Sequence, residues 1–206
     1  MNKQECLIKR IAPFLNTNNY HFKEEMKEEP FSFIEVDTDI KEDEDDILDR
    51  VFNLPDDVFY LGARVNRLKY IVNHCTASFS YATAEAIQRY MLSKWRIGGY
   101  NIIVKRDGSI KVFYPANVVT NGVLGQNPIC YHISWIGGID DDTKQPLDNR
   151  TRSQKETIRL LNEECYNHFV KQGAKIDDIV GHNFFQKSRA CPVFDVHSEL
   201  GYILDK

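Results

Sequence analysis

The chain has 206 residues, of which 42% are hydrophobic and 27% charged, and its formal net charge is −4 at pH 7. This length suits one substantial hydrophobic core, and no apolar run approaches the roughly 18 residues that a transmembrane helix needs, which argues against membrane insertion. The negative charge and the lack of a basic cluster interleaved with aromatic residues argue against nucleic acid as a partner. The five cysteines are odd in number and lack the tight spacing of a disulfide framework.

The first 62 residues are predicted to form an N-terminal extension or a small accessory module, and residues 63–206 the main domain. Within the extension we expect a short strand at 31–36 and a helical turn at 47–52. The acidic run at 35–49 is interpreted as a solvated linker or exposed helix start, in preference to an interaction tail. Because the first residues lack the long apolar core of a secretory signal, we expect a product kept in the cytoplasm until it is released.

From residue 68 onwards the hydrophobic pattern predicts alternating strands and helices. Strands are expected at 68–74, 101–104, 109–113 and 129–136, the second and third joined by a turn at Asp107-Gly108. Helical spacing predicts a helix at about 83–95 with an inward stripe ending at Trp95, and a longer one at about 151–171 that begins with a capping box of Thr151 and Gln154. The alternation implies an α/β fold with a mixed central sheet flanked by helices.

Two histidines and a cysteine have the character of metal ligands. His74 ends the strand expected at 68–74, His182 follows a second short apolar run, and Cys191 comes nine residues later. Zinc favours nitrogen and sulfur donors in a tetrahedral shell, and three protein ligands leave one position open for catalysis. His132, in the strand expected at 129–136, is interpreted as a packed histidine and not as a ligand.

Five segments resemble, in order, the zinc-dependent type-2 N-acetylmuramoyl-L-alanine amidases, which include phage lysozyme-like amidases and share a fold with the peptidoglycan recognition proteins. These segments are 70–77 (YIVNHCTA), 98–110 (GGYNIIVKRDGSI), 133–140 (ISWIGGID), 149–154 (NRTRSQ) and 181–195 (GHNFFQKSRACPVFD). The resemblance covers roughly residues 67 to 200. It implies the amidase fold for the main domain and Zn²⁺ as its cofactor.

Carried over residue by residue, the family's metal ligands fall on His74, His182 and Cys191, the residues already selected. The resemblance also implies that Tyr100 lies beside the reacting water. The family's charge-stabilising cation falls on Arg189. Because the spacing from His182 to Cys191 is one residue longer than is common in the family, Lys187 is the alternative.

The chain departs from the family pattern at two polar positions. Where many relatives have histidine, this sequence has Asn101 directly after the tyrosine and Asn121 in the loop before the central strand. The resemblance implies that these positions line the substrate groove without binding metal. We therefore expect the two asparagines to alter specificity without abolishing the reaction.

The sequence thus predicts a zinc amidase that hydrolyses the bond between N-acetylmuramic acid and L-alanine in bacterial peptidoglycan, with a phage endolysin as the setting. A cytoplasmic amidase that recycles cell-wall fragments would have the same sequence features. A non-catalytic module that binds peptidoglycan or muropeptides is the alternative of a different class, and zinc used only to hold the fold together is a third. The sequence does not indicate an oligomeric state.

Overall fold

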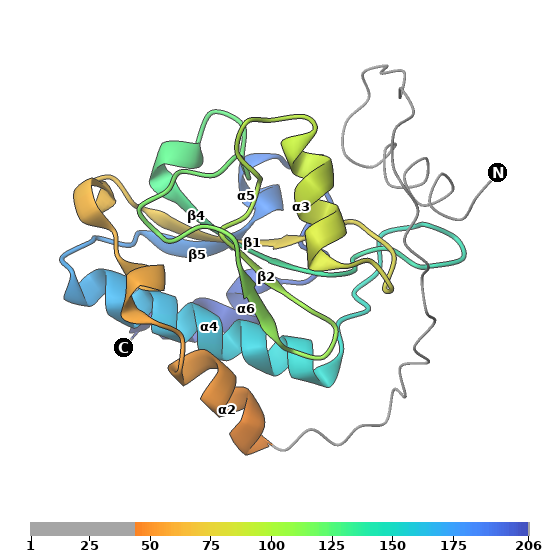
Figure 1. Cartoon of the computed structure of the whole chain (residues 1–206), viewed down its shortest axis with the longest axis horizontal. Helices are drawn as coiled ribbons and strands as arrows, with labels where there is room; N and C mark the ends of the chain where they lie inside the picture. The colour runs from red at the N-terminus through yellow and green to blue at the C-terminus, as the bar shows by residue number, and fades with distance from the viewer. Residues whose placement is uncertain (1–43, 206) are drawn as a thin grey trace. The chain divides into compact units, whose positions relative to one another are not determined.

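A five-stranded sheet lies at the centre of the computed structural model, which describes residues 44–205 (Figure 1). Its strands follow the spatial order β3-β2-β4-β1-β5. The strands are β1 (Tyr70–Cys75), β2 (Ile102–Val104), β3 (Ile110–Val112), β4 (Cys130–Trp135) and β5 (Asp178–Gly181). All neighbouring pairs are parallel except β2 and β3, which form the expected antiparallel hairpin. The prediction of a mixed sheet is therefore confirmed.

Helices cover both faces of the sheet, with α4 and α6 on one face and α3 on the other (Figure 1). The α-helices are α2 (Glu44–Phe52), α3 (Ala84–Leu92), α4 (Arg152–Lys171), α5 (His182–Phe185) and α6 (Val196–Leu200). Short 3-10 helices are η1 (Asp56–Phe59), η2 (Gly62–Arg64), η3 (Asn127–Ile129) and η4 (Gly201–Asp205). Within the described residues, no helix is both long and apolar enough to cross a membrane.

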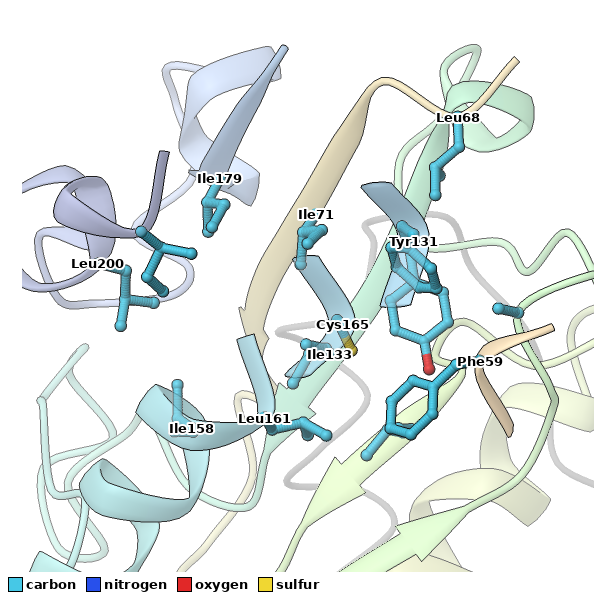
Figure 2. Close-up of a cluster of buried hydrophobic side chains, with 14 of the residues drawn as sticks. Phe59, Leu68, Ile71, Tyr131, Ile133, Ile158, Leu161, Cys165, Ile179 and Leu200 are labelled. Carbon is cyan, nitrogen blue, oxygen red and sulfur yellow. The ribbon is translucent and has the colours of Figure 1, made fainter. Parts of the chain in front are cut away.

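The largest hydrophobic cluster fills the space between the sheet and α4 (Figure 2). Ile71 and Ile133 from the strands meet Ile158 and Leu161 from the helix, and all four are at most 1% exposed. Each side chain of this kind contributes about 1.5–3 kcal/mol when it is fully buried. This packing buries the face of the sheet that α4 covers.

The predicted capping box begins α4. The Thr151 hydroxyl accepts a hydrogen bond from the Gln154 backbone N–H at 3.0 Å, and the Thr151 N–H donates to Gln154 Oε1 at 3.1 Å. These bonds satisfy amide groups that would otherwise lack partners at a helix start. The prediction for the end of α3 was wrong, because that helix stops at Leu92 and Trp95 is 40% exposed.

The described part of the predicted extension packs against the rest of the chain. Ile47 and Val51 of α2 contact Leu160 of α4, and the Phe59 ring stacks on His168 at a centroid distance of 4.4 Å. The helical turn expected at 47–52 lies within α2 and is confirmed. The strand expected at 31–36 lies outside the described residues, and the division of the chain after residue 62 stays a prediction.

A buried amide pair connects β1 to α4 next to the candidate site. Asn73 Nδ2 donates to Asn162 Oδ1 at 2.9 Å, and Asn162 Nδ2 donates to Asn73 Oδ1 at 3.0 Å. Both residues are at most 2% exposed, so neither amide can exchange its partner for water without local opening. The pair holds the side chain of Asn73, the residue that precedes His74, against α4.

Replacing Asn162 with Leu is expected to lower the free energy of unfolding by about 1–3 kcal/mol, because the Asn73 amide is then buried without its partner. Urea denaturation measures the change. The double variant Asn73→Leu/Asn162→Leu is the control, since it removes both polar groups and should lose less stability than the single variant. A double variant less stable than the single one would contradict this explanation.

Candidate metal and catalytic site

Three potential metal ligands meet at the carboxyl ends of β1 and β5. His74 is the fifth residue of β1, His182 is the first residue of α5 directly after β5, and Cys191 lies in the loop that follows α5. The two strands are paired in parallel with Asn73 opposite Gly181, which brings their carboxyl ends together. One nitrogen from each histidine and the cysteine sulfur lie within 4.8 Å of one another, the one such group among residues 44–205. These three residues could hold a metal ion.

The Cys191 thiol is held in place by the end of β1. Its sulfur accepts a hydrogen bond from the Cys75 backbone N–H at 3.2 Å and lies 3.8 Å from His74 Nδ1. The Cys191–Pro192 peptide bond is cis, and the proline ring packs closely on Gly181, where an added Cβ would lie 2.5 Å from Pro192 Cδ. Glycine at 181 therefore lets the cysteine loop approach the end of β5.

Burial keeps both histidines neutral. It lowers the pKa of His74 well below 6.5, and the neighbouring His132 and His182 add to this effect. It also lowers the pKa of His182, which the charge of Arg189 lowers further. Neutral imidazole has a free lone pair, which metal binding requires. Burial raises the pKa of Cys191 well above 9.0, so this side chain is a thiol at neutral pH when no metal is bound.

Each histidine has a partner for its second ring nitrogen. His74 Nε2 lies 3.1 Å from His132 Nδ1, and His182 Nε2 lies 3.2 Å from Gln186 Oε1. His132 is fully buried, and burial lowers its pKa to about 3. His132 is outside the ligand group, in agreement with its interpretation as a packed histidine. Its contact with His74, like that of Gln186 with His182, was not predicted.

Tyr100 lies beside His74, and its place next to a reacting water stays a prediction. Its ring centroid is 5.2 Å from that of His74, and its hydroxyl donates to the Cys75 carbonyl oxygen at 3.4 Å. The residue is 7% exposed. Burial raises the pKa of Tyr100 well above 10.0, and the neighbouring Cys191 and Cys75 raise it further. The phenol therefore keeps its proton at neutral pH and can act as a hydrogen-bond donor.

The two candidate cations occupy different surroundings. Arg189 is half-buried, and its Nε donates to Gln186 Oε1 at 3.2 Å, on the same oxygen that faces His182. Its charge lowers the pKa values of Tyr100, His182 and Cys191, although burial has the larger effect on each of them. Lys187 is exposed, and its ammonium lies 5.5 Å from the centre of the Phe184 ring. The charge of Arg189 is thus the one that reaches the ligand cluster.

The two asparagines predicted to line the groove are in different places. Asn101 is fully buried; its Oδ1 accepts bonds from the Thr120 hydroxyl and the His132 N–H, both at 3.1 Å. Its Nδ2 donates to backbone carbonyls of the loop that follows β3. Asn101 therefore lies inside the fold. Asn121 is exposed, and a substrate contact for this side chain stays a prediction.

The sequence matches no protein-family model. It is similar to the endolysin of Klebsiella phage KP32, with 29% identity over 126 residues that cover 60% of this chain and 79% of the phage protein. The endolysin of Escherichia phage T7 is likewise 29% identical over 127 residues, with the same coverage of both chains. The chain thus spans most of the length of these relatives.

The fold is similar to that of two amidases from Clostridium intestinale. The N-acetylmuramoyl-L-alanine amidase LysC aligns with a TM-score of 0.56 at 21% identity, over 69% of this chain and 88% of that one. The endolysin amidase LysCS aligns with a TM-score of 0.54 at 20% identity, over 69% and 86%. The chain is therefore similar in sequence to phage endolysins and shares the fold of N-acetylmuramoyl-L-alanine amidases.

Proposed function

We propose that this chain is a zinc-dependent N-acetylmuramoyl-L-alanine amidase that acts as a phage endolysin. It would hydrolyse the amide bond between N-acetylmuramic acid and L-alanine in bacterial peptidoglycan. The observation that carries the proposal is the convergence of His74, His182 and Cys191 at the carboxyl ends of two neighbouring parallel strands. The phage relatives support the same assignment, since their names describe them as endolysins.

The donor set fits zinc. Two nitrogen atoms and one sulfur atom suit this ion, and three protein ligands are typical of its catalytic sites. For tetrahedral zinc, bond lengths near 2.1 and 2.3 Å place a nitrogen and a sulfur about 3.6 Å apart. The observed separation between His74 Nδ1 and Cys191 Sγ is 3.8 Å. When bound, zinc would supply a Lewis acid that activates water for attack on the amide carbonyl.

The remaining chemistry would come from side chains around the ligands. As water adds to the carbonyl, negative charge develops on its oxygen, and preformed hydrogen-bond donors stabilise that charge. The protonated Tyr100 hydroxyl is one such donor, and the half-buried Arg189 guanidinium is the second. Arg189 remains charged throughout, so its contribution would be electrostatic, without proton transfer.

Arg189→Gln is expected to lower kcat by roughly 10- to 100-fold, somewhat less than the loss of a complete oxyanion-hole donor because the guanidinium is partly exposed to water. Lys187→Gln is the matched control and should leave kcat nearly unchanged, since Lys187 is exposed and faces Phe184. Steady-state hydrolysis of a muramyl peptide measures both variants. The reverse order of effects would assign the role to Lys187.

Zinc binding at pH 7 is expected to release about one proton per ion, because a ligand must give up its proton before it binds. The two histidines are neutral and release none, whereas Cys191, whose pKa is raised well above 9.0, must lose its thiol proton. Affinity for zinc should therefore rise with pH from 6 to 8. Calorimetry in buffers of different ionisation enthalpy counts the protons, and a count of zero would contradict a thiol ligand.

The proposed partner is peptidoglycan or its muropeptide fragments, and the proposed route is synthesis in the cytoplasm followed by action on the cell wall after release.

An assay with purified, dye-labelled peptidoglycan tests the proposed function. The zinc-loaded protein should release soluble dye, and a chelator that strips zinc should stop the release. Protein that binds the sacculi without releasing dye would favour a non-catalytic binding module of the same fold.

A further inference from the structure

His132 is a buried histidine that the ligand set does not use. It lies on β4, which pairs in parallel with β1, and its partner in the register is Val72. His132 and His74 therefore occupy diagonal positions on the same face of the sheet, a spacing that long side chains can bridge. The resulting contact joins His132 Nδ1 to His74 Nε2 at 3.1 Å.

The contact determines which nitrogen of His74 faces the other ligands. His74 Nδ1 is directed toward the Cys191 sulfur, at 3.8 Å, while Nε2 is directed away from it toward His132. A neutral imidazole carries one proton, and the nitrogen that binds metal must be the other one. If Nδ1 binds the ion, Nε2 carries the proton and His132 Nδ1 must accept it in a hydrogen bond.

The surroundings fix the His132 ring in this position. The backbone N–H of His132 donates to the buried Asn101 Oδ1 at 3.1 Å, and the ring packs on Gly122. A Cβ at position 122 would lie 2.5 Å from His132 Nδ1 and 2.6 Å from its Cγ, which real Cβ atoms do not tolerate. Glycine at 122 is thus required for the ring to reach His74.

We propose that His132 is a positioning residue of the metal centre, which holds His74 in the orientation and tautomer that present Nδ1 to the ion. The inference rests on the proposed zinc centre and adds a residue to it. Partners of this kind around metal-bound histidines orient the ring, and their loss typically lowers metal affinity by about 10- to 100-fold. Ligation itself would remain with His74, His182 and Cys191.

A matched pair of variants isolates the acceptor. His132→Asn places Oδ1 near the position of the imidazole Nδ1. The side chain of His132→Leu has nearly the same shape as that of asparagine but has no hydrogen-bond acceptor. Zinc affinity is measured by competition with a chromophoric chelator, and the visible absorption of the Co²⁺-loaded proteins reports ligand geometry. We expect the Leu variant to bind zinc about 10- to 100-fold more weakly. The Asn variant should retain most of the affinity and the parent Co²⁺ spectrum.

Gly122→Ala provides a second route, because it displaces the His132 ring without removing it, and it decides the question if His132→Leu does not fold. This variant should also lose zinc affinity while its metal-free form keeps the near-ultraviolet circular dichroism of the parent. If the parent and all three variants bind zinc equally well, the proposed role of His132 is wrong and the zinc centre itself still stands. The same holds if the Asn and Leu variants lose zinc affinity equally. A parent protein that binds no zinc would overturn the proposed metal centre itself.

Discussion

Cys191→Ser is expected to abolish both zinc binding and peptidoglycan hydrolysis. Serine is a poor zinc ligand, so the site would keep two histidines and lose the soft sulfur donor that lies 3.8 Å from His74 Nδ1. Activity should fall by more than about 100-fold, because the loss of the ion removes more charge stabilisation than the loss of a single hydrogen-bond donor. Metal content after dialysis and dye release from labelled peptidoglycan are the two measurements.

Cys165→Ala is the matched control for the loss of a thiol. Cys165 is fully buried on α4, on the face of the sheet opposite the site. Its replacement should lower stability slightly and leave the zinc stoichiometry at the parent value. If Cys191→Ser kept stoichiometric zinc and full activity, Cys191 would not be a ligand and the proposed centre would be wrong.

Tyr100→Phe is expected to lower kcat by about 100- to 1,000-fold while zinc affinity stays at the parent value. The substitution removes only the hydroxyl, so the ring keeps its packing 5.2 Å from His74. The hydroxyl is no part of the ligand group, but it is a buried donor beside it. Steady-state kinetics on a muramyl peptide and a parallel zinc titration separate the two effects.

Tyr90→Phe is the control for the loss of a phenol, since Tyr90 lies on α3, is half-buried and is not a member of the ligand group. Its activity should match the parent. A drop in zinc affinity that paralleled the drop in kcat for Tyr100→Phe would instead show that the hydroxyl supports the metal site. Unchanged kcat would remove Tyr100 from the reaction.

Local patterns in the sequence were sufficient to predict most of the elements. The apolar run that ends at His74 predicted β1, and Asp107-Gly108 predicted the turn between β2 and β3, where Gly108 has φ of +77°. The capping box at Thr151 predicted the start of α4. In each case the determining interactions lie within a few residues of one another, so the sequence carries them directly.

Features that depend on contacts between distant segments were not predicted. The partnership of His132 with His74 depends on the register of β4 against β1, and the burial of Asn101 depends on how the 114–120 loop folds over it. Gln186, four residues after His182, had a local signal, because residues at this spacing share a helix face. That signal becomes clear only once α5 is known to begin at His182.

The central claim is best tested by identifying the bond that is cut. Purified peptidoglycan is digested with the zinc-loaded protein, and the soluble products are examined by mass spectrometry. We expect stem peptides with a free L-alanine amino terminus and glycan strands with intact lactyl groups, and neither product with Cys191→Ser. Fragments cut between sugars, or between residues of the peptide stem, would contradict the assignment of an N-acetylmuramoyl-L-alanine amidase.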